Sequence, residues 1–599
     1  MSSERGASCG YIRTVRAITH IWPWLRPYRR LAALALLGTL VSVLINLSIP
    51  LQTARVIDDG IAANDSGLVA RVVILMVVLI VSGMAVAALT TAIAVRLAFG
   101  TITDLRRDLY DHVQSLSFSN LDRLPSGDLL TRLTNDMTKV QTVLTMGLSF
   151  IAQAPIMFIG SLTAIVVLDA GLAVIVAVMV PIIAVIVWYV VRRSSVLYDA
   201  VQTRVDRMNN VLSENITGTE VVKAFVRQRH EIERFDVVAD DLADQATQVN
   251  QLVASLMPTL IALSSLGIAA VVWLGGNNVM DGTLSEGDLV AFISYLAMVA
   301  MPLMIFAFVQ PLLSAANASM ARIDEVLRHL PDVPDVIDGI DLASLPTPGE
   351  IEFEGVLFSY ATSSDDSRSS DNAALENVDL RIRQGTTVAI LGATGSGKSS
   401  LVHLIPRFYD ATAGTVRVGG VDVRELDKNS LRRGVGIALQ SPQLFSGTVM
   451  ENLRYGRPDA TDAEVIEAAK AAQANDFVAA MTDGYDSVIE QGGANLSGGQ
   501  RQRLAIARTL VTDPAILILD DSTSAVDLET EAKIQDALAA YDDRTVLLVA
   551  QRISTALGAD EIVVLDDGRV CAHGTHDDLI ATNSVYQEIF ASQLGEPVA

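Results

Sequence analysis

The chain has 599 residues, too many for one hydrophobic core, so we expect at least two domains. Half of the residues are hydrophobic, only 5% are aromatic, and the mean hydropathy is +0.39, which excludes an ordinary soluble protein and indicates several membrane spans beside a polar domain. The net charge of −24 argues against nucleic acid as the main partner, and the two cysteines, Cys9 and Cys571, exclude a disulfide framework and a cysteine-based metal cluster.

An interfacial segment begins the apolar half of the chain. Residues 21–25 include Trp22 and Trp24, and tryptophan favours the headgroup zone of a bilayer. Six apolar stretches follow, each close to the ~20 residues that a helix needs to cross the hydrocarbon. They cover residues 31–50, 68–94, 144–168, 172–191, 253–274 and 289–313. Only Asp169, Ala170 and Gly171 separate the third stretch from the fourth, so these two are predicted to form an antiparallel helical hairpin.

Basic residues predict the orientation of these spans. Arg26, Arg29 and Arg30 precede the first span, residues 106–107 follow the second, and residues 192–193 follow the fourth, whereas the alternate connections are short and hold few cations. We therefore expect a multi-pass protein of the cell (cytoplasmic) membrane, with its N-terminus and its C-terminal half in the cytoplasm.

Two long polar connections lie on the predicted cytoplasmic side. At about 50 and 60 residues they exceed ordinary loops, so they should be helical extensions of the spans. Residues 119–128 and 214–225 each contain a short helix-capable piece set off by Gly or Pro. Such a piece suits a docking element, although a solvated helical hairpin explains it equally well.

The middle of every predicted span lacks Asp, Glu, Lys and Arg, which counts against a proton-coupled or ion-selective mechanism. The fifth and sixth spans instead carry adaptable and aromatic side chains: Met257, Met298, Met301, Met304, Phe306 and Phe308. This composition suits an apolar or amphipathic substrate, a small molecule or a lipid, although contacts with the bilayer and with neighbouring helices explain it equally well.

Composition changes sharply at Leu-Pro-Asp-Val-Pro, residues 330–334. We predict a transmembrane domain over residues 1–330, an acidic linker over residues 331–345 and a second domain over residues 346–599. A Ser/Asp-rich insert, residues 363–372, is predicted to be a surface loop.

A glycine loop begins the chemistry of the second domain. An apolar run leads into residues 392–399, which read G-x-x-x-x-G-K-S at the start of a helix. Glycine N–H groups can surround phosphate oxygens, Lys398 can reach the β- and γ-phosphates, and the Ser399 hydroxyl can hold Mg²⁺. The domain is therefore predicted to bind a nucleoside triphosphate through Gly392, Thr394, Gly395, Ser396, Gly397, Lys398, Ser399 and Ser400.

Two further motifs belong to the same chemistry. Residues 515–519 read as a buried parallel strand that ends in Asp520, and in phosphate-loop proteins such an aspartate holds Mg²⁺. Upstream, residues 497–500 read Ser-Gly-Gly-Gln at the start of a helix, a second anion-binding helix end. One phosphate loop and one phosphate-directed helix cap suggest a nucleotide sandwiched between two such domains.

These motifs resemble those of ATP-binding-cassette (ABC) transporters. Residues 496–500, Leu-Ser-Gly-Gly-Gln, resemble the family signature, and their place between the phosphate loop and Asp520 also matches. The whole chain resembles an ABC exporter half-transporter, a polytopic α-helical membrane domain of six spans fused to one α/β nucleotide-binding domain. The resemblance implies ATP and Mg²⁺ as ligands and ATP hydrolysis coupled to export by alternating access.

The resemblance also implies roles for individual residues. Tyr360 matches the aromatic residue that stacks on adenine, and Gln440 matches the glutamine that links Mg²⁺ and water to the membrane domain. Ser399, Gln440 and Asp520 form the implied Mg²⁺ set. The two cytoplasmic connections correspond to coupling helices. The signature residues that should face the ATP of a partner cassette are Ser497, Gly498, Gly499 and Gln500.

Two catalytic positions depart from the family pattern. Where the family places a glutamate as general base, this chain has Asp521, whose carboxylate is roughly 1–1.5 Å shorter in reach. A base must come within about 2.6–3.2 Å of its proton, and a small misplacement costs ~100-fold in rate. Where the family has a histidine, this chain has Gln551, which can donate a hydrogen bond but cannot carry a proton. Both positions are therefore expected to be degenerate.

We interpret the chain as the degenerate-site subunit of a heterodimeric, multidrug-type exporter. Its own site would retain ATP, and its intact signature would complete the competent site of a second half-transporter. The alternatives are a homodimeric exporter that uses Asp521 as a slow base, and an ATP-gated channel, membrane regulator or importer of the same architecture. The sequence does not identify the substrate.

Overall fold

The computed structural model describes residues 20–360, 373–540 and 543–594. Residues 1–19 and the Ser/Asp-rich insert lie outside these residues, as do the side chains of Met304, Phe306 and Phe308. The chain divides into two compact units. The first comprises residues 1–114 and 126–328, and the second comprises residues 115–125 and 329–599.

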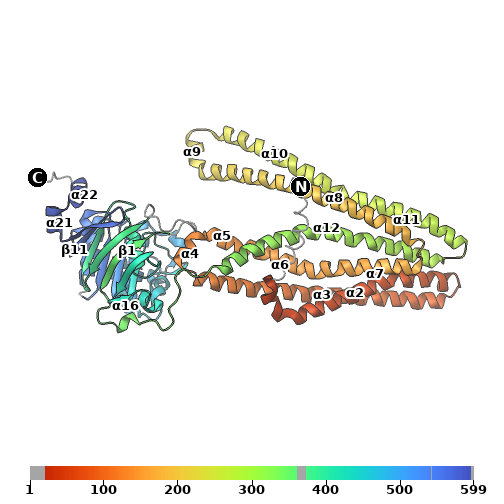
Figure 1. The fold of residues 1–599 in the computed structure, drawn as a ribbon, viewed down its shortest axis with the longest axis horizontal. Helices are drawn as coiled ribbons and strands as arrows, with labels where there is room; N and C mark the ends of the chain where they lie inside the picture. The colour runs from red at the N-terminus through yellow and green to blue at the C-terminus, as the bar shows by residue number, and fades with distance from the viewer. Residues whose placement is uncertain (1–19, 361–372, 541–542, 595–599) are drawn as a thin grey trace. The chain divides into compact units, whose positions relative to one another are not determined.

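The first unit is a bundle of long helices (Figure 1). On length and composition, the helical stretches His20–Ile61, Ser66–Ser115, Ala173–Thr217 and Gln228–Met280 can each cross a membrane. The third predicted span is divided between two α-helices by a π-helical segment, and the sixth lies within the long helix α12. The α-helices of this unit are α2 (Arg29–Arg55), α3 (Ser66–Ser115), α5 (Ser126–Thr131), α6 (Met137–Met146), α7 (Ala152–Leu168), α8 (Ala173–Thr217), α9 (Thr219–Ala224), α10 (Gln228–Ala254), α11 (Leu256–Met280) and α12 (Glu286–Arg328).

The predicted short turn between the third and fourth spans is present, but α7 packs mainly on α12 and α8 on α10, so the two helices do not pack closely on each other as a hairpin would. The carboxylate of Asp169 accepts hydrogen bonds from the backbone N–H groups of Gly171 at 2.7 Å and Leu172 at 3.0 Å. These bonds satisfy donors at the start of α8 that have no partner within the helix. The turn between α7 and α8 is thus held by one side chain.

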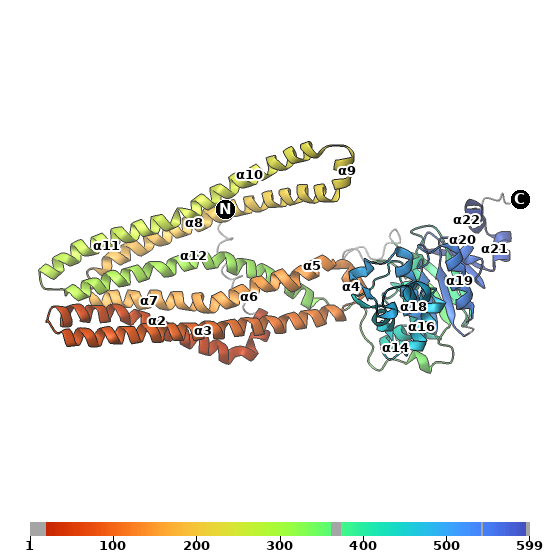
Figure 2. The ribbon, with the colours of Figure 1, turned by 180° about the vertical axis from the view of Figure 1, so that it is seen from behind.

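The helices α8 and α10 extend well beyond the apolar spans and end at the short helix α9, and both views show this pair apart from the other helices of the unit (Figures 1 and 2). The extension is polar and is held by cross-helix ion pairs, Arg204–Asp241 at 3.0 Å and Arg234–Glu214 at 2.6 Å. The second predicted connection is therefore a helical extension, as expected from its length.

The second unit contains two sheets that share a hydrophobic core. An antiparallel sheet has the strand order β2-β1-β4-β5, and a six-stranded, mainly parallel sheet has the order β12-β11-β3-β10-β9-β6, while β7 pairs with β8. The strands are β1 (Ile351–Phe358), β2 (Leu375–Ile382), β3 (Thr387–Leu391), β4 (Ala413–Val418), β5 (Val421–Asp422), β6 (Val435–Ala438), β7 (Gly447–Thr448), β8 (Val488–Ile489), β9 (Ile516–Asp520), β10 (Thr545–Val549), β11 (Glu561–Asp566) and β12 (Arg569–Gly574).

Helices cover the parallel sheet, so its central strands are buried on both faces and read as continuous apolar runs. The helices of this unit are α4 (Phe118–Arg123), α13 (Lys398–Leu404), α14 (Lys428–Gly434), α15 (Val449–Leu453), α16 (Asp462–Ala471), α17 (Asn475–Ala479), α18 (Gly498–Val511), α19 (Leu528–Ala539), α20 (Ile553–Ala556), α21 (His576–Thr582) and α22 (Ser584–Leu594). The predicted combination of a helical membrane region with an α/β domain is confirmed.

The parallel register explains why the functional motifs meet. Val549 of β10 pairs with Asp520 of β9 and Ile390 of β3, and β6 runs parallel to β9. The carboxyl ends of these strands therefore lie at one edge of the sheet, the edge where open α/β sheets bind ligands.

Helix α4 belongs to the second unit although its sequence lies between two predicted spans. The buried side chain of Asn120 holds it to the chain after α12. Its amide nitrogen donates to the Leu330 carbonyl at 3.2 Å, and its amide oxygen accepts from the Asp332 N–H at 3.0 Å. The first predicted connection therefore does contain a docked helix.

Candidate nucleotide-binding site

The glycine loop between β3 and α13 has the backbone that a phosphate cradle requires. Gly392, Gly395 and Gly397 have φ angles of 155°, 88° and 97°, a region that favours glycine. A Cβ atom at Gly397 would lie 2.5 Å from the Ala374 carbonyl oxygen, so a larger residue does not fit there. Lys398 is buried, and its ammonium donates to the Gly392 and Ala393 carbonyls at 2.9 and 2.8 Å.

Two polar groups in this loop fit a phosphate ligand. The Ser396 hydroxyl is buried and has no hydrogen-bond partner in the described part of the chain. Burial lowers the pKa of Lys398, while the charges of Asp521 and Asp520 oppose this shift. A buried cation and an unpaired buried hydroxyl are both costly without an anionic partner. Thr394 lies in the same loop between Gly392 and Gly395.

Two of the three residues expected to hold Mg²⁺ lie side by side, whereas the third, Gln440, contacts Asp521. The Ser399 hydroxyl donates to the Asp520 carboxylate at 3.0 Å, and Asp520 is only 2% exposed at the end of β9. Burial raises the pKa of Asp520, although the hydrogen bond from Ser399 opposes this shift. A hydroxyl and a carboxylate are oxygen ligands of the kind Mg²⁺ prefers, so this pair fits the ion.

Tyr360 follows β1 and lies in an aromatic cluster. Its ring makes edge contacts with Phe358 and Tyr409, with centroids 4.8 and 5.2 Å apart, and its hydroxyl lies 3.1 Å from that of Ser400 in the glycine loop. Tyr360 is 40% exposed, so its ring is partly open to a ligand. The structure thus places the predicted adenine-stacking residue beside the phosphate loop.

The two degenerate positions contact each other through one carboxylate oxygen. Oδ2 of Asp521 accepts a hydrogen bond from the Gln440 side-chain amide at 3.0 Å and another from the Gln551 amide at 2.9 Å. Burial raises the pKa of Asp521, while the hydrogen bond from Gln440 opposes this shift. Asp521 has a φ of 48°, a left-handed conformation that its hydrogen-bonded surroundings maintain.

The signature residues form the N-terminus of α18. The Ser497 hydroxyl accepts from the Gln500 N–H at 3.3 Å, and the Gln500 side chain accepts from the Ser497 N–H at 2.9 Å, which is a reciprocal capping box. Gly498 and Gly499 begin the helix beside Ala525. Within residues 20–360, 373–540 and 543–594, this turn makes no hydrogen bond or ion pair with the phosphate loop. The structure therefore does not bring the two phosphate-directed motifs of this chain together.

Three site-lining residues escaped the sequence analysis. His403 of α13 has its Nε2 atom 3.7 Å from the Asp520 carboxylate, and burial lowers its pKa while the charges of Asp520 and Asp122 oppose this shift. The Tyr409 hydroxyl donates to the Asp122 carboxylate of α4 at 2.7 Å. His403 lies in the last turn of α13, which begins at the phosphate loop, but no local pattern pairs Tyr409 with a residue so distant in sequence.

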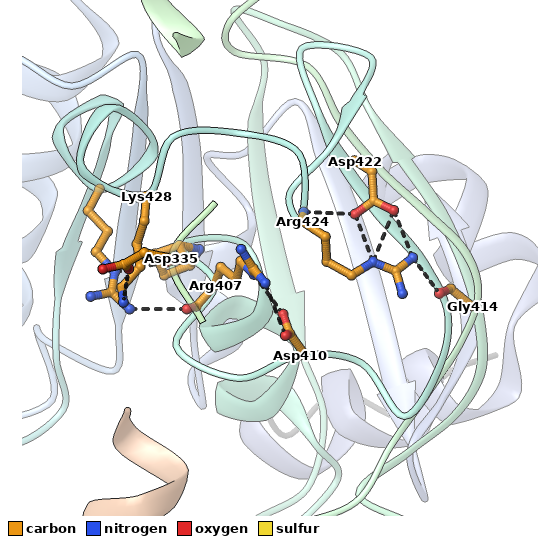
Figure 3. A network of polar contacts seen from close by, with 9 residues as sticks. Asp335, Arg407, Asp410, Gly414, Asp422, Arg424 and Lys428 are labelled. Carbon is orange, nitrogen blue, oxygen red and sulfur yellow. Dashed lines mark hydrogen bonds and ion pairs between the residues drawn. The ribbon is translucent and has the colours of Figure 1, made fainter. Parts of the chain in front are cut away.

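A network of charged residues fixes the loop that presents Tyr409 (Figure 3). The Arg407 guanidinium is buried and makes two hydrogen bonds to Asp410, at 2.7 and 3.2 Å. The Arg432 guanidinium donates to the carbonyls of Pro406 and Arg407 at 3.3 and 3.1 Å. Because both arginines bind the backbone or side chains of this loop, Tyr409 has a defined position facing α4.

Comparisons with known proteins agree with this architecture. Residues 32–303 match the ABC transporter transmembrane region, and residues 375–524 match the ABC transporter family. The chain is 37% identical over 572 residues to the uncharacterised ABC transporter ATP-binding protein YfiB of Bacillus subtilis, covering 96% of this chain and 98% of the relative. It is 34% identical over 496 residues to an ATP-dependent lipid A-core flippase of Syntrophus aciditrophicus, covering 83% and 81%.

A solved structure is similar over nearly the whole length. A bacterial Atm1-family ABC exporter with ATP bound matches with a TM-score of 0.78 and 27% identity, covering 95% of this chain and 99% of the solved chain. The likeness extends over the helical unit and the α/β unit alike.

Proposed function

Because the chain belongs to the ABC transporter family and is an exporter-type fusion of a transmembrane region with an ATP-binding cassette, we propose that it is the degenerate-site half of a heterodimeric exporter. As in the family, ATP hydrolysis drives transport. The observation that carries the heterodimer proposal is the pairing of Asp521 with Gln440 and Gln551.

The contacts of Asp521 oppose a role as an efficient base. Burial raises the pKa of Asp521 and favours proton acceptance, but the oxygen Oδ2 already accepts hydrogen bonds from two amides that compete with an attacking water. The short side chain also limits the reach of the carboxylate toward an attacking water. Gln551 can orient a phosphate or a water but cannot move a proton. This site therefore retains ATP and turns it over slowly.

The remaining residues are those that binding requires. Lys398 and the N–H groups of the glycine loop hold the phosphates, and the Tyr360 ring stacks on the adenine. Ser399 and Asp520 would hold Mg²⁺ directly, and Gln440 would reach it from the loop after β6. Bound Mg²⁺ supplies charge neutralisation of the β- and γ-phosphates.

The signature turn of α18 serves the partner's nucleotide. The side chains of Ser497 and Gln500 each accept a hydrogen bond from the other residue's N–H group, so the turn is formed before any ligand binds. Its helix end favours the negative charge of a phosphate. A subunit that completes a hydrolytic site on a dissimilar partner needs an intact signature, but it does not need intact hydrolytic residues of its own.

Coupling to the membrane region runs through α4 and α9. Helix α4 contacts the cassette through Phe118, stacked on Phe408 at 4.3 Å, and through the bond from Tyr409 to Asp122. Helix α9 instead presents exposed apolar side chains, Val221 at 60% and Phe225 at 74% exposed. Exposed apolar side chains at the tip of a polar extension favour a protein partner, so we assign α9 to the partner's cassette.

The substrate is assigned only by chemical class. The uncharged middle of the spans and the methionines of the fifth and sixth spans suit an apolar or amphipathic molecule. The similarity to a lipid A-core flippase supports an amphipathic substrate of this kind. We place the protein in the cytoplasmic membrane, with the cassette in the cytoplasm, on the distribution of arginines around the spans.

Replacement of the two candidate bases tests the heterodimer proposal. The chain is co-expressed with its partner half-transporter, and ATP turnover is measured in nanodiscs. Replacing the partner's catalytic glutamate with glutamine should abolish turnover, whereas Asp521→Ala should change it by less than about twofold. Lys398→Ala is the control that removes ATP from this chain's site. A loss with Asp521→Ala as large as the loss from the partner's glutamate would refute the proposal.

The homodimer alternative predicts a different result. If the chain purified alone shows brisk ATP cleavage that depends on Asp521, it is a symmetric exporter with a slow base. Flux against a gradient in vesicles that contain both subunits separates a pump from an ATP-gated channel or regulator, because a channel cannot move substrate uphill.

A further inference from the structure

The turn before α2 and the start of α2 carry a cluster of unpaired arginines. Arg26 lies in the 3₁₀ turn Arg26–Tyr28, and Arg29 and Arg30 begin α2. With Pro23 and Pro27 they line a hollow of about 460 Å³. Among residues 20–360, 373–540 and 543–594, none of these three guanidinium groups has a hydrogen bond or an ion pair.

Two aromatic anchors hold the hollow in place. The Trp24 indole N–H donates to the Asp108 carboxylate of α3 at 2.6 Å, and the Tyr28 hydroxyl donates to Asp104 at 2.9 Å. Gly100 makes room for the Tyr28 ring, because a Cβ atom there would lie 2.6 Å from it. With Trp24 and Tyr28 turned toward α3, the exposed residues Arg26, Arg29 and Arg30 face outward as a fixed group.

Apolar surface continues from the arginines along the same helix. Leu34 and Leu37 follow Arg30 by four and seven residues, a spacing that places them on one helical face. They are 52% and 56% exposed, as expected of side chains that contact the bilayer. The arginine hollow thus lies at the polar end of a surface suited to acyl chains.

We propose that this hollow binds the phosphate of an anionic phospholipid, with the acyl chains lying along Leu34 and Leu37. Guanidinium groups bind phosphate oxygens in a bidentate manner and are more weakly hydrated than ammonium groups. Three unpaired cations disfavour a zwitterionic headgroup, since its own ammonium would be repelled. The apolar face beside the arginines favours a lipid over free phosphate, which shares the same anionic chemistry.

Binding of a fluorescent phosphatidylglycerol to the full-length protein in detergent, followed by anisotropy, tests the proposal. Arg29→Gln/Arg30→Gln should weaken binding by roughly tenfold or more, since each arginine near an anionic surface contributes about a factor of five. Arg192→Gln/Arg193→Gln, the matched loss of two charges after the fourth predicted span, should change it less than about threefold. Arg29→Lys/Arg30→Lys should cause a smaller loss than the glutamine pair, because lysine keeps the charge but not the bidentate geometry of the guanidinium group.

The competing ligands identify the source of the phosphate. Unlabelled phosphatidylglycerol should displace the probe, whereas phosphatidylcholine and millimolar inorganic phosphate should not. Displacement by inorganic phosphate at the same sites would replace the lipid assignment with a phosphate site and overturn the proposal. Equal losses of affinity in Arg29→Gln/Arg30→Gln and Arg192→Gln/Arg193→Gln would also overturn the proposal. Such a result would indicate that the lipid responds to surface charge in general.

A single substitution keeps the test decisive if the double variant does not fold. Arg26→Gln lies in the 3₁₀ turn before α2, so it leaves the transmembrane helix unchanged. It should weaken phosphatidylglycerol binding by about fivefold, while ATP binding by the cassette stays intact. Unchanged affinity in a folded Arg26→Gln protein would contradict the proposed site.

Discussion

The hydrogen bond from Tyr409 to Asp122 predicts how firmly α4 is held to the cassette. Tyr409 is 9% exposed, and burial together with this bond to Asp122 raises its pKa far above the ordinary value. In Tyr409→Phe the bond disappears, but Asp122 is exposed and regains water. A hydrogen bond to a charged group is worth about 1.5–3 kcal/mol, and solvent access reduces this to about 1–1.5 kcal/mol. The undocked population of α4 should therefore rise by roughly tenfold.

Hydrogen exchange of the full-length protein measures this population. The N–H groups of Asn120 and Leu121 bond to the Ser117 carbonyl at 3.1 Å, so they exchange when α4 opens. Tyr409→Phe should speed their exchange by about tenfold and lower the coupling of ATP turnover to transport. Asp122→Asn keeps an acceptor and should have a smaller effect.

Two comparisons decide whether loss of the Tyr409–Asp122 hydrogen bond causes the faster amide exchange in α4. Tyr455→Phe is the matched control, because Tyr455 is 62% exposed and its hydroxyl has no hydrogen bond in the described part of the chain. It should leave α4 exchange unchanged. The double variant Tyr409→Phe/Asp122→Ala should lose no more protection than Asp122→Ala alone. The reasoning would be refuted if the losses of protection in Tyr409→Phe and Asp122→Ala simply added in the double variant. Unchanged amide exchange in Tyr409→Phe would refute it as well.

Three further outcomes follow from single sites. Gly397→Ala should abolish binding of labelled ATP, because Gly397 has a φ of 97° and no room for a Cβ, whereas Gly127→Ala, with nothing within 4 Å, should not. Asp136→Ala should lower the thermal midpoint of the detergent-solubilised protein, at a cost of about 2–3 kcal/mol, because buried Asp136 accepts hydrogen bonds from Ser319 and Arg322. Exposed Asp240 provides the control, and an equal midpoint for Asp136→Ala and Asp240→Ala would contradict this. Burial raises the pKa of Asp136, but hydrogen bonds from Arg322 and Ser319 outweigh burial and leave the pKa below its ordinary value of 3.8. Its stabilisation should therefore be complete above about pH 4 and lost at lower pH, so the two midpoints should converge there. Phe225→Asp at the end of α9 should impair assembly with the partner or coupled turnover while leaving ATP binding intact, and Ile232→Asp, 60% exposed on α10, should not.

Local sequence determined the parts of the protein whose conformation depends on near neighbours. The glycine loop, the signature turn and the apolar spans are each set by residues within a few positions, through glycine φ angles, a capping box and hydrophobic length. For this reason the phosphate loop and the short turn at Asp169 were predictable, whereas Ser399 and Asp520, 121 residues apart, were paired through the role such an aspartate has in phosphate-loop proteins. The order of β3, β9 and β10 in one parallel sheet then brought Asp520, Asp521 and Gln551 to a common edge.

Tertiary structure alone decided the contacts between distant segments. Tyr409 and Asp122 are 287 residues apart, and the assignment of α4 to the cassette unit follows from such contacts rather than from any local pattern. The same holds for the double hydrogen bonding of Asp521 and for the unpaired arginines at the start of α2, since a sequence does not state which charges find a partner. Side-chain pairing depends on which surfaces the fold brings together, and periodicity along one chain segment carries no information about the segment that packs against it.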